Sequence, residues 1–163
     1  MRRFGFLVLG LCAAGAALAD DRSDCAAADG AFLSGTVATR LVFVHGQFRR
    51  GVELSHSRFD LAPDDGGATY QVAVDNVFAN GYQPGQKGVP AALAGIGVGD
   101  RLALCGALYS KGRGIHFVHT NCGDAPTPAH PDGWLRRVNR DGTDGANLEA
   151  NQAYCAIFGQ SPR

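Results

Sequence analysis

The sequence predicts a mostly β protein built as a small five-stranded Greek-key barrel of the OB type. Two observations predict it. Alternating apolar side chains mark five strand-like segments. These segments come as three strands, a short helical connection, and two more strands, which is the order expected of an OB-like barrel. A β-sandwich made from the same strands is the alternative.

The first three expected strands lie in the amino-terminal half of the chain. Residues 32–44 are rich in β-branched and apolar side chains, with Gly35 as a bend or bulge. Residues 52–61 change apolar parity near His56, which indicates a bulge there. Residues 70–78 alternate apolar and polar side chains. Together they predict a meander of three strands.

The remaining elements follow a glycine-rich connection. Residues 90–94 form a helical turn that begins with proline. Residues 101–109 and 114–120 read as a hairpin of two strands. Residues 148–158 have helical spacing, which predicts a C-terminal helix that stops at Gly159.

The first 19 residues have the three parts of a cleavable export signal. Arg2 and Arg3 precede an apolar run that ends in Ala17-Leu18-Ala19. We therefore expect a signal peptide (1–19), a flexible segment (20–30) and a single β domain with a C-terminal extension (31–163). The expected location is periplasmic or secreted, with no membrane span after cleavage. A retained anchor and a lipoprotein modified at Cys12 are the alternatives.

The charge is balanced, with 15 basic and 15 acidic residues. Loss of the signal removes two arginines and no acid, which leaves 13 basic against 15 acidic residues. Such a chain exerts no global attraction on nucleic acid or on an anionic membrane. This balance counts against a nucleic-acid partner and leaves that class open; we expect a monomer that binds an unknown ligand or an envelope partner.

Four cysteines remain after cleavage, and an even number in an exported chain predicts disulfides. Four cysteines allow three pairings. We favour Cys25–Cys155, near the two ends, with Cys105–Cys122, which flank the expected hairpin. Zinc is the rival explanation, and the absence of a C-x-x-C pair argues against it.

Histidines supply the first candidate site residues. His116 and His119 have opposite parity, so a regular strand points them to opposite faces. A bulge would be needed for the two to hold a metal. His56 and Arg58 lie at the other suspected bulge, where side chains are often turned toward the rim of a site.

The segment His130-Pro131-Asp132-Gly133-Trp134 is the second candidate. Proline, aspartate and glycine make a turn between a histidine and the only tryptophan. Trp134 could offer a stacking surface beside polar contacts from His130 and Asp132. The alternative is that the turn caps one end of the barrel. No nucleophile elbow, P-loop, metalloprotease or dinucleotide motif is present.

Five short motifs follow one another along the chain. They are His56-Ser57-Arg58-Phe59, Gly99-Asp100, Gly106-Ala107-Leu108-Tyr109, Ile115-His116-Phe117-Val118-His119 and His130-Pro131-Asp132-Gly133-Trp134. Taken in order, they resemble the pattern H-x-R-F, G-D, G-x-Y, I-H-W-T-H and H-x-G-G-W of a bacterial family of small exported proteins classed as a domain of unknown function. This chain departs from the pattern at Val118, where the family usually has threonine. The resemblance implies a compact β domain in the envelope or medium and implies no activity.

Three functions fit these observations. The first is a non-catalytic binding domain whose site lies on a barrel rim. The second is a metal-assisted hydrolase of phosphodiesters, in which clustered histidines and an acid would hold a divalent metal. The third is a structural envelope or secreted partner protein. The predicted ligand-binding residues are His56, Arg58, His116, His119, His130, Asp132 and Trp134.

Overall fold

The computed structural model describes residues 13–163. Most of the expected signal peptide, including Cys12, therefore lies outside the described residues. Residues 13–19 open the first helix, α1 (Ala13–Ala27). Within the described part of the chain, no helix is long and apolar enough to cross a membrane.

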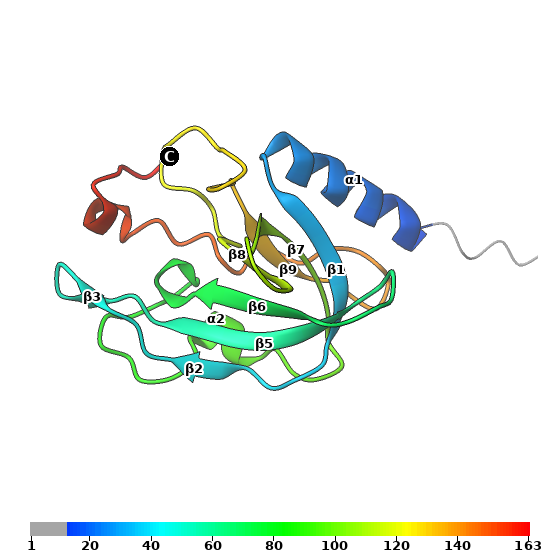
Figure 1. Ribbon diagram of the computed structural model, residues 1–163, viewed down its shortest axis with the longest axis horizontal. Helices are drawn as coiled ribbons and strands as arrows, with labels where there is room; N and C mark the ends of the chain where they lie inside the picture. Colours follow the sequence, from blue (N-terminus) through cyan, green and yellow to red (C-terminus); the bar gives the residue numbers. More distant parts are fainter. Residues whose placement is uncertain (1–12) are drawn as a thin grey trace, which may run out of the picture.

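Five strands close into the predicted barrel, so the β-sandwich alternative is wrong (Figure 1). All neighbouring strands are antiparallel except β6 and β8, which run parallel. In chain order the five barrel strands are arranged 1-2-3-5-4-1, the Greek-key order of an OB-type barrel. Around the barrel they are β1 (Ala31–Val37), β5 (His56–Pro63), β6 (Tyr70–Asp75), β8 (Gly114–His116) and β7 (Arg101–Leu108), and β7 pairs with β1.

The barrel interior is filled by side chains of one parity from each strand. Leu61, Val72, Leu104 and Ile115 are fully buried in one apolar cluster. Each such side chain contributes about 1.5–3 kcal/mol by leaving water. The predicted helical connection is confirmed as α2 (Ala91–Ala94), whose Leu93 closes one end of this core.

Two predicted strands are interrupted. The first becomes β1 and β2 (Val42–Val44), and β2 pairs with the start of β5 outside the barrel. The second begins as β4 (Val52–Glu53), which forms a small hairpin with β3 (Phe48–Arg49). The chain then enters β5 at His56, so the change of parity marks a break between two sheets instead of a bulge.

One strand was not expected. β9 (Trp134–Arg137) pairs with β7 along residues 102–105, on the edge beside β8. The short β8 leaves this stretch of β7 unpaired, and β9 satisfies its backbone groups.

The predicted helix at residues 148–158 is wrong. Only one 3-10 turn forms there, η2 (Cys155–Phe158). Ahead of this turn the backbone bonds to neighbouring segments: Leu148 N–H donates to Leu135, and Asn151 N–H donates to Phe78. Asparagine side chains also compete, because the Asn147 carboxamide accepts from the backbone N–H of Glu149.

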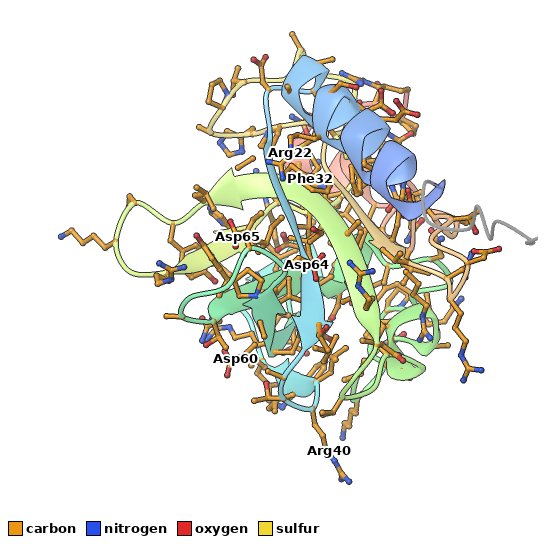
Figure 2. All side chains as sticks on the ribbon, turned by 90° about the vertical axis from the view of Figure 1, so that its right-hand side faces the viewer. Arg22, Phe32, Arg40, Asp60, Asp64 and Asp65 are labelled. Atoms are coloured by element: carbon orange, nitrogen blue, oxygen red, sulfur yellow. A yellow bond between two sulfur atoms is a disulfide. The ribbon has the colours of Figure 1, made fainter. Side chains whose placement is uncertain are left out.

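Residues 20–30 were expected to be loose, and the structure differs. Helix α1 continues to Ala27 and lies across β1 and β7 (Figure 1). Asp21 is held by Arg136 at 2.6 Å, and Arg22 covers the ring of Phe32 at 4.8 Å, as Figure 2 shows for the latter pair. These contacts and the Cys25 disulfide attach the helix to the barrel.

The four cysteines within residues 13–163 all form disulfides as predicted, but the favoured pairing is wrong. The bonds are Cys25–Cys105 and Cys122–Cys155. Cys105 points out of the barrel toward α1, in a cluster with Cys25 and Trp134. Cys122 lies in a different cluster with Cys155. The predicted hairpin ends at His116, so Cys105 and Cys122 never come opposite each other. Two disulfides are typical of proteins in an oxidising compartment.

Candidate functional site

A cleft of about 740 Å³ opens where β5 begins and β6 ends. Its other walls come from the β3–β4 hairpin, the segment that follows β8, and the C-terminal residues. Figure 1 shows the β3–β4 hairpin and the C-terminal residues on the side of the barrel away from α1, while the segment after β8 extends toward the junction of α1 and β1. Its polar and aromatic lining includes His45, Arg49, His56, Arg58, Asp75, Phe78, Phe117, His119, Asn121, Asp124, His130 and Phe158.

Asp75 is the centre of the polar contacts in the cleft. It lies opposite His56 in the β5–β6 register, and its Oδ1 is 2.8 Å from His56 Nε2. Its Oδ2 is 3.8 Å from His119 Nε2. Burial would raise the pKa of Asp75, but the hydrogen-bonding contact with His56 and the charges of the nearby histidines outweigh it and hold that pKa below its usual range. Asp75 is therefore a carboxylate at neutral pH.

His119 reaches this carboxylate because β8 is broken. Phe117 has a left-handed φ of 52°, which interrupts the alternation of side chains after His116. Val118 then enters the core and His119 turns into the cleft, where its ring stacks on Phe78 at 3.7 Å. The regular strand expected over residues 114–120 ends at His116, so alternation along a strand does not decide where His119 points.

The ionisation of His119 follows from its surroundings. Burial lowers the pKa of His119, although Asp75 acts in the opposite direction. The ring is thus neutral at neutral pH. Its Nδ1 lies 3.0 Å from the Thr120 carbonyl, which can only accept, so Nδ1 carries the proton. The lone pair of Nε2 then faces the cleft beside Asp75, and the two together can accept hydrogen bonds from a ligand.

His116 and His130 lie at one edge of the cleft, on either side of Phe117. The centroid of the Phe117 ring is 4.1 Å from that of His116 and 4.7 Å from that of His130. His130 lines the cleft, whereas His116 lies just outside it on the barrel surface. Burial lowers the pKa of His116, so this imidazole is also neutral at neutral pH.

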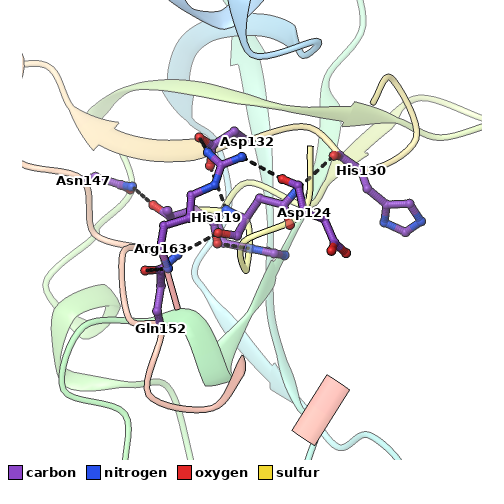
Figure 3. A network of polar contacts seen from close by, with 9 residues as sticks. His119, Asp124, His130, Asp132, Asn147, Gln152 and Arg163 are labelled. Carbon is purple, nitrogen blue, oxygen red and sulfur yellow. Dashed lines mark hydrogen bonds and ion pairs between the residues drawn. The ribbon is translucent and has the colours of Figure 1, made fainter. Parts of the chain in front are cut away.

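Asp132 does not line the cleft, contrary to the prediction. Its carboxylate accepts from the backbone N–H of Asn121 at 2.8 Å and from the guanidinium of Arg163. Figure 3 shows Arg163 between Asp132, Asp124 and Gln152, with the ring of His130 directed away from this network. Asp132 thus fixes the loop that carries His130 instead of contacting a ligand.

Trp134 was also predicted to bind ligand, and its position corrects that prediction. Its side chain is buried on the α1 side of the barrel, with its centroid 6.1 Å from that of Phe32 and Arg136 over its ring. β9 pairs with β7, and this register turns Trp134 toward the helix. The alternative interpretation, in which this turn closes one side of the barrel, is the better one.

Sequence patterns missed several lining residues. Asp75 and Phe78 were assigned to a regular strand, but β6 ends at Asp75 and a 3-10 turn, η1 (Asn76–Phe78), follows. Asp75 could have been identified as a site residue from its position at the end of a strand, opposite His56. Arg49 and Phe158 come from segments far apart in the chain, and no local pattern links them.

A metal-assisted hydrolase needs about three ligands directed at one point. His56 and His119 are both directed at Asp75, and His116 and His130 are separated from them by Phe117. Within residues 13–163, no group of three or more histidine, cysteine or acidic side chains could hold a metal ion. The geometry thus gives no support to this hypothesis.

Comparisons with protein-family models, curated proteins and solved structures return no match to this chain. The site is therefore interpreted from its own geometry.

Proposed function

We propose that the protein is an exported binding module and that the cleft binds an anionic ligand. The observation that carries this proposal is a pair of arginines in the lining of the cleft. Arg49 and Arg58 both line it, both are exposed, and neither has a carboxylate within ion-pair distance among the described residues. Arginine side chains left without partners beside a cavity are suited to phosphate or carboxylate groups.

Asp75 and Asp124 also line the cleft, and neither lies within ion-pair distance of Arg49 or Arg58. Asp75 is engaged by His56, whose Nε2 lies 2.8 Å from its Oδ1. Asp124 accepts a hydrogen bond from Gln160. The histidines around the cleft provide additional donors, and two of them flank the exposed part of Phe117. A ligand with several negative charges can therefore be held by Arg58 and by imidazoles together.

A cleft of this size also favours a binding module over a structural protein. Small-molecule sites are concave, about 300–1,000 Å³ in volume, with a few convergent polar groups in a partly apolar lining. The cleft, at about 740 Å³, has this volume and this mixture of residues. The proposed place of action is the periplasm or the medium, which the two disulfides support.

Inorganic tripolyphosphate is a suitable probe, since it has charge and no other recognition feature. We expect isothermal titration calorimetry at low ionic strength to show one site, and Arg58→Ala to weaken it about tenfold, because a hydrogen bond to a charged group contributes about 1.5–3 kcal/mol. Arg40→Ala removes the same charge outside the cleft, where Figure 2 shows it projecting away from the molecule, and should change affinity less than twofold. Equal effects of the two substitutions, or no binding, would contradict the proposal.

A further inference from the structure

We propose that the ligand of this cleft is a single-stranded oligonucleotide, whose bases stack on the partly exposed rings at one edge of the cleft and whose phosphates contact Arg58 and Arg49. This inference rests on the proposed function and names its ligand class. Two features carry it: the rings themselves, and the line of small and cationic side chains beside them.

The first arm of the series of rings lies on the barrel surface. Tyr109 meets His116 with ring centroids 5.2 Å apart, and His116 meets Phe117 at 4.1 Å. Phe117 then meets His130 at 4.7 Å. Four partly or fully exposed side chains thus provide adjoining π-faces from the β7–β8 turn to the edge of the cleft. Nucleic-acid bases stack on such faces without sequence preference.

The second arm lies inside the cleft. Phe117 is followed by His119, with centroids 6.0 Å apart, and His119 stacks on Phe78. Phe78 in turn stacks on Phe158 at 5.6 Å, and the guanidinium of Arg49 lies 5.1 Å from the Phe158 ring. Phe78 is 5% exposed and His119 is 8% exposed, so the rings of this arm stack on one another and offer no free face to a base. The series ends at the exposed guanidinium of Arg49. The acceptor pair formed by His119 Nε2 and Asp75 lies along it and can receive an N–H group of a base.

A line of outward-facing side chains runs beside the first arm. Arg58 on β5 is paired with Ala73 on β6, and the parallel register of β6 with β8 places His116 next to Ala73. Ala73 is small, so no bulky side chain stands between Arg58 and His116 along this row. The next outward-facing pair along the same two strands is His56 and Asp75, which line the cleft. A phosphodiester chain can follow these strands with Arg58 at its side.

The position of the cleft on the barrel is also the one expected for an oligonucleotide ligand. OB-type barrels bind oligonucleotides and oligosaccharides on the face of their second and third strands and on the adjoining loops. Here those strands are β5 and β6, and the loop of residues 38–55 contributes the β3–β4 hairpin to the cleft. Oligosaccharides also stack on aromatic rings. Two arginines without carboxylate partners favour the charged backbone of a nucleic acid instead.

The balanced charge of the whole chain does not oppose this ligand. Net charge governs long-range attraction, whereas affinity for a single strand comes from a local cationic groove and from stacking. We therefore expect moderate affinity that falls steeply as salt concentration rises.

Fluorescence anisotropy of the full chain with a labelled oligothymidylate octamer tests the inference. An octamer of abasic sites has the same phosphates without bases and serves as the matched probe. We expect the oligothymidylate to bind about tenfold more tightly than the abasic octamer, because each stacked base contributes about 1–3 kcal/mol. Phe117→Leu should reduce this preference at least fivefold, while Tyr70→Leu, a ring outside the cleft, should leave it unchanged.

Equal affinity for the two octamers, or an unchanged preference in a Phe117→Leu variant whose melting curve shows a folded protein, would overturn the inference. So would tighter binding of an uncharged hexasaccharide than of oligothymidylate. These outcomes are distinct from failure of the proposed function. If tripolyphosphate binding still depends on Arg58 while the octamers bind equally, the anionic site stands and the nucleic-acid assignment falls.

Discussion

Replacement of Cys25 and Cys105 together by alanine is expected to lower the free energy of unfolding by about 4 kcal/mol. The bond joins residues 80 apart in sequence, and closing so long a loop removes much of the entropy of the unfolded chain. It also anchors the last turn of α1 to β7. Urea unfolding of the oxidised wild type and of the double variant measures the difference.

The second disulfide provides the matched control. Cys122→Ala with Cys155→Ala opens a loop with a sequence separation of 33 and should cost a similar amount, about 3–4 kcal/mol. Only the first double variant should release α1, which amide hydrogen exchange over residues 20–27 detects. A loss below about 1 kcal/mol in both variants, or equal exchange of α1 in both, would contradict the assigned roles.

Gly133→Ala should destabilise the protein by about 3 kcal/mol, near the upper end of the usual range for overpacking. A Cβ at this position would lie 2.2 Å from the Phe117 carbonyl oxygen and 2.6 Å from that of Cys105. Both atoms belong to the backbone, so they move only if β7 or the turn after β8 moves. Thermal and urea unfolding of the purified variant test this expectation.

Gly97→Ala is its control. A Cβ there would meet only the side chain of Asp100, at 4.0 Å, and we expect a change of no more than about 0.5 kcal/mol. If the two substitutions had equal effects, the close approach at Gly133 would not be what holds this segment. Because Gly133 lies between the loop that carries His130 and strand β9, the same contact also positions one wall of the cleft.

The barrel could be predicted because its strands leave a local signal. Alternation places residues such as Leu61 and Val72 in the core, and the order of the strands restricts the topology to very few arrangements. The C-terminal helix could not be predicted in the same way. Its helical spacing is real, but long-range hydrogen bonds to Leu135 and Phe78 take the backbone groups that a helix would have used.

The disulfide pairing depends on the backbone conformation of one residue, Phe117. If residues 114–120 had formed one regular strand, Cys105 and Cys122 would have flanked a hairpin. The left-handed conformation of Phe117 ends that strand early and carries Cys122 to the far side of the cleft. A phenylalanine in this conformation has no sequence signal, because the preference for glycine or asparagine at positive φ is absent.

The left-handed conformation of Phe117 also explains why His119 reaches the cleft. His56, Arg58, His119 and His130 line one cleft, and His116 lies beside it. Trp134 and Asp132 were grouped with them on the basis of proximity in sequence, but the turn between His130 and Trp134 separates two faces of the barrel. Asp75 was missed because its pairing with His56 depends on the register of β5 and β6.

Chemical-shift mapping with tripolyphosphate tests most directly whether the cleft is the ligand site. Backbone and imidazole resonances of the ¹⁵N-labelled protein would be followed during titration. We expect the largest shifts at Arg58, His56 and His130, and none at Trp134 or along α1, which lie on the other side of the barrel. Shifts concentrated around Trp134 and α1, or spread evenly over the surface, would contradict the assignment of the cleft as the binding site.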